Sequence, residues 1–276
     1  MSAIEEKRIF AERIGRTVAF VAAGLGIATV GIADDRVGEV RIDRRCTPND
    51  IAAGDQCVAV ATDTELLYWT ADKDTDGEST TEPTDGVEFT ALDGPDATVV
   101  GFASNRLRVA DADGTIHAET DDGWRTIGAV DGTVTAIDGD LVATEAGVYR
   151  IADGLQHVGL TGVRDISTTG VPRAATAEGL FTLGNGWLET LAGDFRVVAA
   201  SSDGDHAHAA AAETVYATTD GDWTVVDIPI DAPVADIAYG ETSCVVTNDG
   251  TLALPGETGW RTYPLGLLDV TGIAIP

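Results

Sequence analysis

The feature that most constrains the fold of this chain is an internal repeat with a period in the thirties. Seven times along the sequence, a short turn is followed by glycine, or a residue in its place, and then by the apolar start of a strand. The seven copies are Gly26-Ile27, Glu65-Leu66-Leu67, Gly114-Thr115-Ile116, Gly147-Val148-Tyr149, Gly179-Leu180-Phe181, Thr214-Val215-Tyr216 and Gly250-Thr251-Leu252. The steps between copies are 32 to 39 residues, apart from one of 49. Short apolar segments flank most copies, so each unit contains four strands.

Four short strands per unit at this period predict the blades of a β-propeller. A four-stranded blade can bury its two faces only against other blades, so the units should close into a ring. Residues 268–275 look like an innermost strand with no blade after it, whereas the first unit begins at Thr17 with its second strand. We therefore expect an all-β, seven-bladed β-propeller whose ring is closed by the C-terminal strand pairing in the first blade. Residues 1–16 would be an N-terminal extension and residues 17–276 a single propeller domain.

One apolar run offers a competing interpretation. Thr17–Ala33 contains no charged residue and follows several basic ones, which is the outline of a signal or anchor segment. The run is slightly short for a membrane span and contains three glycines. The repeat assigns it to two β-strands instead, so we expect no membrane segment.

The charge balance indicates the solvent in which the chain works. Asp and Glu number 46 against 17 Lys and Arg, the net charge is −29, and only Lys7 and Lys73 are lysines. This composition resembles that of proteins from salt-accumulating cytoplasm, where a Debye length of about 3 Å at molar salt screens the repulsion between carboxylates. Excess negative charge also disfavours nucleic acid as a partner. The three cysteines form no C-x-x-C pair, which fits a reducing, cytoplasmic compartment.

Two resemblances follow from short motifs. The turns Thr120–Trp124 and Thr219–Trp223 resemble degenerate Asp-box turns of sialidase-type and sortilin-type propellers, which implies that Trp124, Trp187, Trp223 and Trp260 pack between blades. The chain as a whole, with its Glu5-Glu6-Lys7-Arg8 start, resembles an uncharacterised haloarchaeal family of seven-bladed propellers. That resemblance implies a fold and a type of organism, and it implies no activity.

Two patterns raise the question of a metal. The 49-residue step contains an insertion, residues 71–86, whose Asp72, Asp74 and Asp76 match the first half of a calcium-binding loop. Pro83 stands where that loop needs a bidentate glutamate, so a solvated loop between the third and fourth strands of blade two is the favoured interpretation. His206-Ala207-His208 could pair two imidazoles, but it has no third ligand nearby and is interpreted as exposed polarity. We expect no metal and no cofactor.

Arginines are the better signal for binding. Arg44, Arg45, Arg164 and Arg196 fall in connections from an outer strand to the next inner strand, which share one face around the central channel. Turns between third and fourth strands, on the other face, are acidic. The four arginines are therefore a candidate binding site for an anionic ligand or for carboxylates of a partner. The alternative is that each arginine pairs with a local acid, such as Asp43 or Asp165.

No sequence pattern indicates a nucleophile, a phosphate-binding loop or a catalytic metal, so no catalytic residue is assigned. The favoured function is a non-catalytic protein-interaction platform, monomeric and cytoplasmic, with an unknown protein partner or anionic ligand. The alternative is an enzyme, a hydrolase or lyase, that acts on a small anionic substrate at the central channel. That alternative requires carboxylates or histidines to converge with the arginines near the channel.

Overall fold

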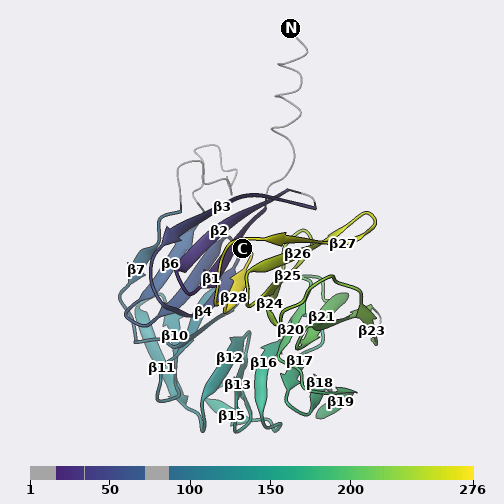
Figure 1. Cartoon of the computed structure of the whole chain (residues 1–276). Coiled ribbons are helices and arrows are strands. Elements are labelled where there is room, and N and C mark those ends of the chain that lie inside the picture. Colours follow the sequence, from purple (N-terminus) through teal and green to yellow (C-terminus); the bar gives the residue numbers. More distant parts are fainter. Residues whose placement is uncertain (1–16, 34, 72–86, 220) are drawn as a thin grey trace.

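The computed structural model describes residues 17–33, 35–71, 87–219 and 221–276, and all regular structure in these ranges is β-strand. Twenty-eight strands form seven four-stranded antiparallel sheets that stand around a common centre (Figure 1). Each sheet is one blade, so the fold is the predicted seven-bladed β-propeller.

Within each blade the strands follow one another from the inner to the outer edge. Blades one and two are β28 (Gly272–Ala274), β1 (Thr17–Ala23), β2 (Gly26–Ala33) and β3 (Arg36–Arg44), then β4 (Pro48–Gly54), β5 (Cys57–Thr62), β6 (Leu66–Thr70) and β7 (Thr90–Leu92). Blades three and four are β8 (Val99–Ala103), β9 (Arg106–Ala110), β10 (Thr115–Thr120) and β11 (Gly123–Ala129), then β12 (Val134–Asp138), β13 (Leu141–Thr144), β14 (Val148–Ile151) and β15 (Leu155–His157). Blades five and six are β16 (Val163–Ser167), β17 (Arg173–Thr176), β18 (Gly179–Leu183) and β19 (Trp187–Ala192), then β20 (Val197–Ala200), β21 (His206–Ala211), β22 (Thr214–Thr219) and β23 (Asp222–Val226). Blade seven is β24 (Val234–Tyr239), β25 (Ser243–Thr247), β26 (Thr251–Gly256) and β27 (Gly259–Pro264).

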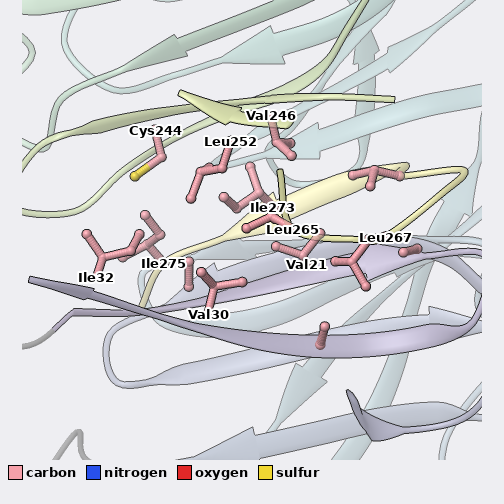
Figure 2. Packing of buried hydrophobic residues seen from close by; sticks show 14 of the residues in the cluster. Val21, Val30, Ile32, Cys244, Val246, Leu252, Leu265, Leu267, Ile273 and Ile275 are labelled. Carbon is pink, nitrogen blue, oxygen red and sulfur yellow. The ribbon is translucent and has the colours of Figure 1, made fainter. Parts of the chain in front are cut away.

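The ring closes as the sequence predicts. β28 pairs antiparallel with β1 through Phe20↔Ala274, Val21↔Ile273 and Ala22↔Gly272. Figure 2 shows Ile273 and Ile275 among side chains of the first and seventh blades, including Val21, Val30 and Leu252. The paired strand is shorter than the predicted 268–275 because residues 268–271 form the connection that leads into it.

Seven hydrophobic clusters hold the blades together, one at each boundary between consecutive blades. The second strand of each blade lies between two neighbours and is buried on both faces, as in β5 and β13. These strands are rich in alanine and valine because blades approach each other closely near the centre, where larger side chains would not fit.

The apolar run at the start of the domain is part of this core. Thr17–Ala33 forms β1 and β2, which pair along their whole length, and Phe20, Val21 and Ile27 are fully buried. Among the residues that the structure describes, no helix is long and apolar enough to cross a membrane. The prediction of two strands is confirmed.

The insertion in blade two also lies where the sequence places it. β6 ends at Thr70 and β7, the outer strand of the same blade, begins at Thr90. The extra residues therefore separate the third and fourth strands, as predicted. Asp72, Asp74 and Asp76 lie outside the described residues.

Because strands alternate in direction, the connections divide between two faces. We call linker face the one with the connections between blades, such as 45–47, 193–196 and 265–271, and the turns between second and third strands, such as 24–25 and 63–65. β1 begins at Thr17 on the opposite face and reaches the linker face at its other end. Thr17 lines a hollow on that opposite face together with Asp35, Glu241 and Glu257.

Candidate functional site

Inner strands of all seven blades surround a central channel of about 540 Å³. Its wall carries four aspartates, Asp50, Asp138, Asp165 and Asp236, and its linker-face end carries Arg164 and Arg196. The channel is therefore the place where carboxylates and arginines converge, and the bonds of each group decide what it can do.

Three of the aspartates occupy the same position of their inner strands, in the motifs Pro48-Asn49-Asp50-Ile51, Val163-Arg164-Asp165-Ile166 and Val234-Ala235-Asp236-Ile237. The residues at this position in the other blades are small, namely Gly272, Gly101, Ala136 and Ala199. In the three aspartate blades the strand pairing shifts by one residue just before the aspartate. A bulge of this kind turns a side chain away from the regular direction, and here it directs the carboxylate toward the next blade.

Each of these carboxylates links two blades. One oxygen accepts the backbone N–H of the following isoleucine, and the other accepts a backbone N–H from the next blade. The bonds between blades are Val100 N–H to Asp50, Val198 N–H to Asp165 and Ile273 N–H to Asp236, all 2.8 Å. The third bond lies at the ring closure. Asp138 acts similarly between blades four and five, because one of its oxygens accepts both the N–H (2.5 Å) and the hydroxyl (3.0 Å) of Thr168.

Burial changes the acidity of these groups. Loss of solvent raises the pKa of Asp50 and of Asp236 to about 7 and that of Asp165 to about 8, because an ionised carboxylate is poorly stabilised inside the wall. The backbone N–H donors oppose this effect and the other channel carboxylates reinforce it. Burial also raises the pKa of Asp138. The raised pKa values thus arise at groups whose oxygens already hold the blades together.

The four arginines predicted as a site do not form a ring of free cations. Arg164 and Arg196 lie side by side at the channel mouth and share Asp194, and Arg164 also donates to the carbonyl of Phe195 at 3.1 Å. Arg44, at the end of β3, pairs with Glu65 of blade two. None of these four arginines pairs with Asp43 or Asp165, the local acids that the sequence suggested. Asp43 pairs with Arg41 instead, at 2.8 Å.

Arg45 differs from the other three. Its side chain is exposed, and within the described ranges no carboxylate lies at ion-pair distance from it. Arg45 is thus the member of the predicted site that remains available to a partner.

The contrast between a basic and an acidic face is not found. Turns between second and third strands lie on the linker face with the arginines, and most of them are acidic. These acids include Asp63, Glu65, Asp111, Asp113, Glu145, Glu178, Glu213 and Asp249. The sequence interpretation missed them because it considered only the turns between third and fourth strands. The four arginines therefore lie on a face that is itself acidic.

The two histidines of β21 have different surroundings. His206 is exposed, as expected, but His208 is buried and the expectation fails for it. Nδ1 of His208 lies 2.5 Å from the hydroxyl of Tyr239, and the ring meets Trp260 edge-on. Burial lowers the pKa of His208 to about 4. In the described part of the chain, no three His, Cys, Asp or Glu side chains gather as a metal site would require.

The tryptophans after the acidic turns are packing residues, as the sequence predicts. Each contributes to the cluster shared with the preceding blade; these are Trp124, Trp187, Trp223 and Trp260. The indole N–H of Trp124 donates to the carbonyl of Asp93 at 3.0 Å, and that of Trp187 to Val158 at 3.1 Å. Both bonds anchor an outer strand to the connection that precedes its blade.

A family model described as "Beta-prop_HVO_0234:-like, beta propeller" matches residues 3–276. The chain belongs to this β-propeller family. No curated protein matches its sequence.

Several solved structures have the same fold as this chain, with low sequence identity to it. A functionally unknown protein from Desulfotomaculum acetoxidans DSM 771 has a TM-score of 0.69 at 14% identity, covering 94% of this chain and 98% of that one. A candidate 6-phosphogluconolactonase from Bacteroides fragilis NCTC 9343 has a TM-score of 0.63 at 12% identity, covering 95% and 98%. The WD40 β-propeller domain of Doa1 has a TM-score of 0.63 at 13% identity, covering 92% and 89%. At these identities the likeness extends to the fold alone.

Sequence reasoning missed the channel aspartates of this propeller. Among 46 acidic residues three aspartates do not stand out. The signal in the sequence was their common position within the repeat. Each aspartate lies 11 or 12 residues before the threonine that ends the second strand of its blade, which is Thr62, Thr176 or Thr247. Aligning the inner strands as well as the third strands would have revealed it.

Proposed function

We propose that this propeller is a non-catalytic protein-interaction platform of a salt-rich cytoplasm. The observation that carries the proposal is that three of the four channel aspartates have both oxygens bonded, one of them to the next blade, while Asp138 bonds the next blade through one oxygen. Both oxygens of Asp50, Asp165 and Asp236 accept backbone N–H groups. A general acid or base needs an oxygen directed at substrate, and these oxygens serve the wall instead.

The solvent and compartment are inferred from composition. A net charge of −29 with two lysines suits molar salt, and Cys46, Cys57 and Cys244 are all free, which suits a reducing cytoplasm. At molar salt, exposed charges interact only over about 3 Å. A partner must therefore be held by short contacts and apolar burial rather than by a long-range field.

The test compares partner recovery by the full-length chain and its variants at native ionic strength. We expect a discrete protein partner that in turn recovers this chain when it is itself tagged. Replacing Arg44 and Arg45 by Ala should lower recovery several-fold with little change in the melting temperature, because exposed ion pairs contribute about 0–1 kcal/mol to folding. Arg36→Ala, an exposed arginine on the opposite face, is the matched control. Absence of a reciprocal partner would contradict the platform.

A second candidate function has one observation in its favour. Arg164 and Arg196 stand at the mouth of a channel whose wall holds Asp165, with its pKa near 8, so an anionic substrate would meet both charge types there. The similar Bacteroides fragilis protein is a candidate 6-phosphogluconolactonase, so a hydrolase of phosphorylated sugar lactones is the form of enzyme to test. Turnover of such lactones that disappears in Asp165→Asn and in Arg164→Met would establish the enzyme in place of the platform.

A further inference from the structure

Three segments far apart in sequence meet on the linker face at the ring closure. The N–H of Gly24 donates to the carbonyl of Leu268 at 3.0 Å, and a side chain at residue 26 would overlap the carbonyl of Arg44 and lie 2.9 Å from Cα of Arg45. Leu25 stands between these two contacts, in the turn from β1 to β2. We call Leu25, Arg45 and Leu268 the seam patch.

The seam patch exposes two leucines on an otherwise polar face. Leu25 is 53% and Leu268 67% exposed. In the described part of the chain three other large hydrophobic side chains are exposed: Val171 on the opposite face, and Leu188 and Val225 on outer strands. Single exposed leucines are ordinary, but two on turns joined by a backbone hydrogen bond, next to a segment with an exposed arginine, indicate an interaction surface.

The seam patch is rigid before any partner arrives. Besides the Gly24–Leu268 bond, the N–H of Thr271 donates to Ala22 at 2.9 Å, and Val270 below the patch belongs to the buried cluster between blades seven and one. Positive φ values at Gly26 (128°) and Asp269 (53°) fix the two turns. A preformed surface loses little conformational entropy on binding.

Charge selects the kind of partner. Arg45 is exposed and lacks an ion pair in the described ranges, whereas its neighbour Arg44 is held by Glu65. Guanidinium groups pair best with carboxylates, in a two-pronged geometry. Asp269, on the far side of Gly24, repels a second acid there. The carboxylate of a ligand is thus directed to the Arg45 side of the leucines.

We propose that the seam patch binds a segment of a partner protein that packs an apolar side chain against Leu25 and Leu268 and places an Asp or Glu on Arg45. This inference rests on the proposed platform function and names the chemistry of its partner. The apolar contact provides the affinity at high salt, and the Arg45–carboxylate pair orients the segment.

Site-specific photocrosslinking in the native cells tests the inference at residue resolution. The full chain carries p-benzoylphenylalanine at Leu268 or, as a matched control of 65% exposure on β19, at Leu188. We expect the probe at Leu268, and not the one at Leu188, to capture one protein segment with an Asp or Glu within a few residues of the crosslinked side chain. Arg45→Glu should reduce the yield about tenfold, equivalent to about 1.4 kcal/mol, and an acid-to-arginine change in the segment should restore it.

The possible failures are distinguishable. Three results would overturn the seam patch. The probe at Leu268 crosslinks to a second copy of this chain, or the probes at Leu268 and Leu188 give equal yields. The third is that Arg45→Glu changes the yield no more than the control Arg36→Glu does. A third probe, at Arg196 beside the channel, separates the two proposals. If the probe at Arg196 captures a protein that the probe at Leu268 does not, the proposed platform function is supported and the seam-patch proposal is wrong. If none of the probes captures a protein, both proposals are wrong.

Discussion

At the scale of single residues, the channel aspartates couple stability to pH. With pKa values of about 7 to 8 in the folded chain and 3.8 as the ordinary value, Asp50, Asp165 and Asp236 hold protons that the unfolded chain releases. Their protonated forms therefore favour the fold at low pH, and that contribution is lost as pH rises through 7 to 8. We expect the melting temperature to fall between pH 6.5 and 8.5, and to fall less in Asp165→Asn.

The range from pH 6.5 to 8.5 lies above the titration of His208, whose effect on stability has the opposite sign. Burial lowers the pKa of His208 to about 4, so its side chain is neutral in the folded chain. It lowers the stability of the fold only as pH falls below the ordinary histidine value of 6.5. Asp203→Asn is the control, because hydrogen bonds lower the pKa of this exposed carboxyl and it stays ionised throughout. Calorimetry gives the melting temperature of each chain at pH 6.5 and 8.5. An equal fall in melting temperature in Asp165→Asn and in the unaltered chain would show that Asp165 does not titrate in this range.

At the scale of strands and turns, the blades fall into two kinds. In blades two, four, five and seven the inner strand is bulged and the second strand ends in a buried threonine; these are Thr62, Thr144, Thr176 and Thr247. The first two strands of blades one, three and six show neither feature. Asp50, Asp165 and Asp236 each belong to a bulged blade that is followed by an unbulged one, so the carboxylate reaches a regular inner strand. Blade four, followed by another bulged blade, has Ala136 at that position and bonds through Thr135 to Val163.

The threonine turn of blade four allows a sharp test of this element. The Thr144 hydroxyl donates to the carbonyl of Gly147 and accepts the N–H groups of Ala146 and Gly147. Thr144→Val keeps the shape and removes the acceptor of the N–H groups of Ala146 and Gly147, of which Gly147 is buried, while the Gly147 carbonyl keeps the backbone N–H of Thr144. The loss should lower the free energy of unfolding by about 1–3 kcal/mol. Thr218 is also buried, but its hydroxyl has no partner among the residues that the structure describes, so Thr218→Val should be neutral or stabilising. Denaturant titrations of both variants measure the difference, and equal losses would show that the turn bonds contribute nothing.

The sequence reveals elements better than contacts. Repeated turn-and-strand starts give the blades, the insertion and the closing strand, because a period survives substitution of most residues. The partners of the arginines could not be found this way: Arg44 meets Glu65 and Arg164 meets Asp194, which lie 21 and 30 residues away on other strands or connections. His208 looked exposed beside an acidic turn, but its partner Tyr239 belongs to the next blade. Such pairs depend on how neighbouring blades face each other, which a repeat does not encode.

At the scale of the whole molecule, stability depends on a closure of three residues. β28 joins the two ends of the propeller, and it brings Ile273 and Ile275 into the cluster between blades seven and one and Ala274 into the cluster between blades one and two. It also supplies the N–H that Asp236 accepts. Without β28, blade one exposes the inner edge of β1, and the cluster between blades seven and one keeps the side chains of β1 and β2 but loses those that β28 brings.

Removing residues 272–276 should therefore abolish cooperative unfolding rather than lower its midpoint slightly. Burial of two isoleucine side chains is worth about 1.5–3 kcal/mol each, and the loss of the ladder and of the Asp236 bond adds to this, against a total stability of about 5–15 kcal/mol. A chain shortened by Pro276 alone, which lies beyond β28, should melt like the full-length chain. Circular dichroism melts and denaturant curves of the two chains provide the comparison. A single sharp transition at the full-length midpoint in the chain without β28 would show that the remaining contacts between blades hold the ring and that the closing strand is dispensable.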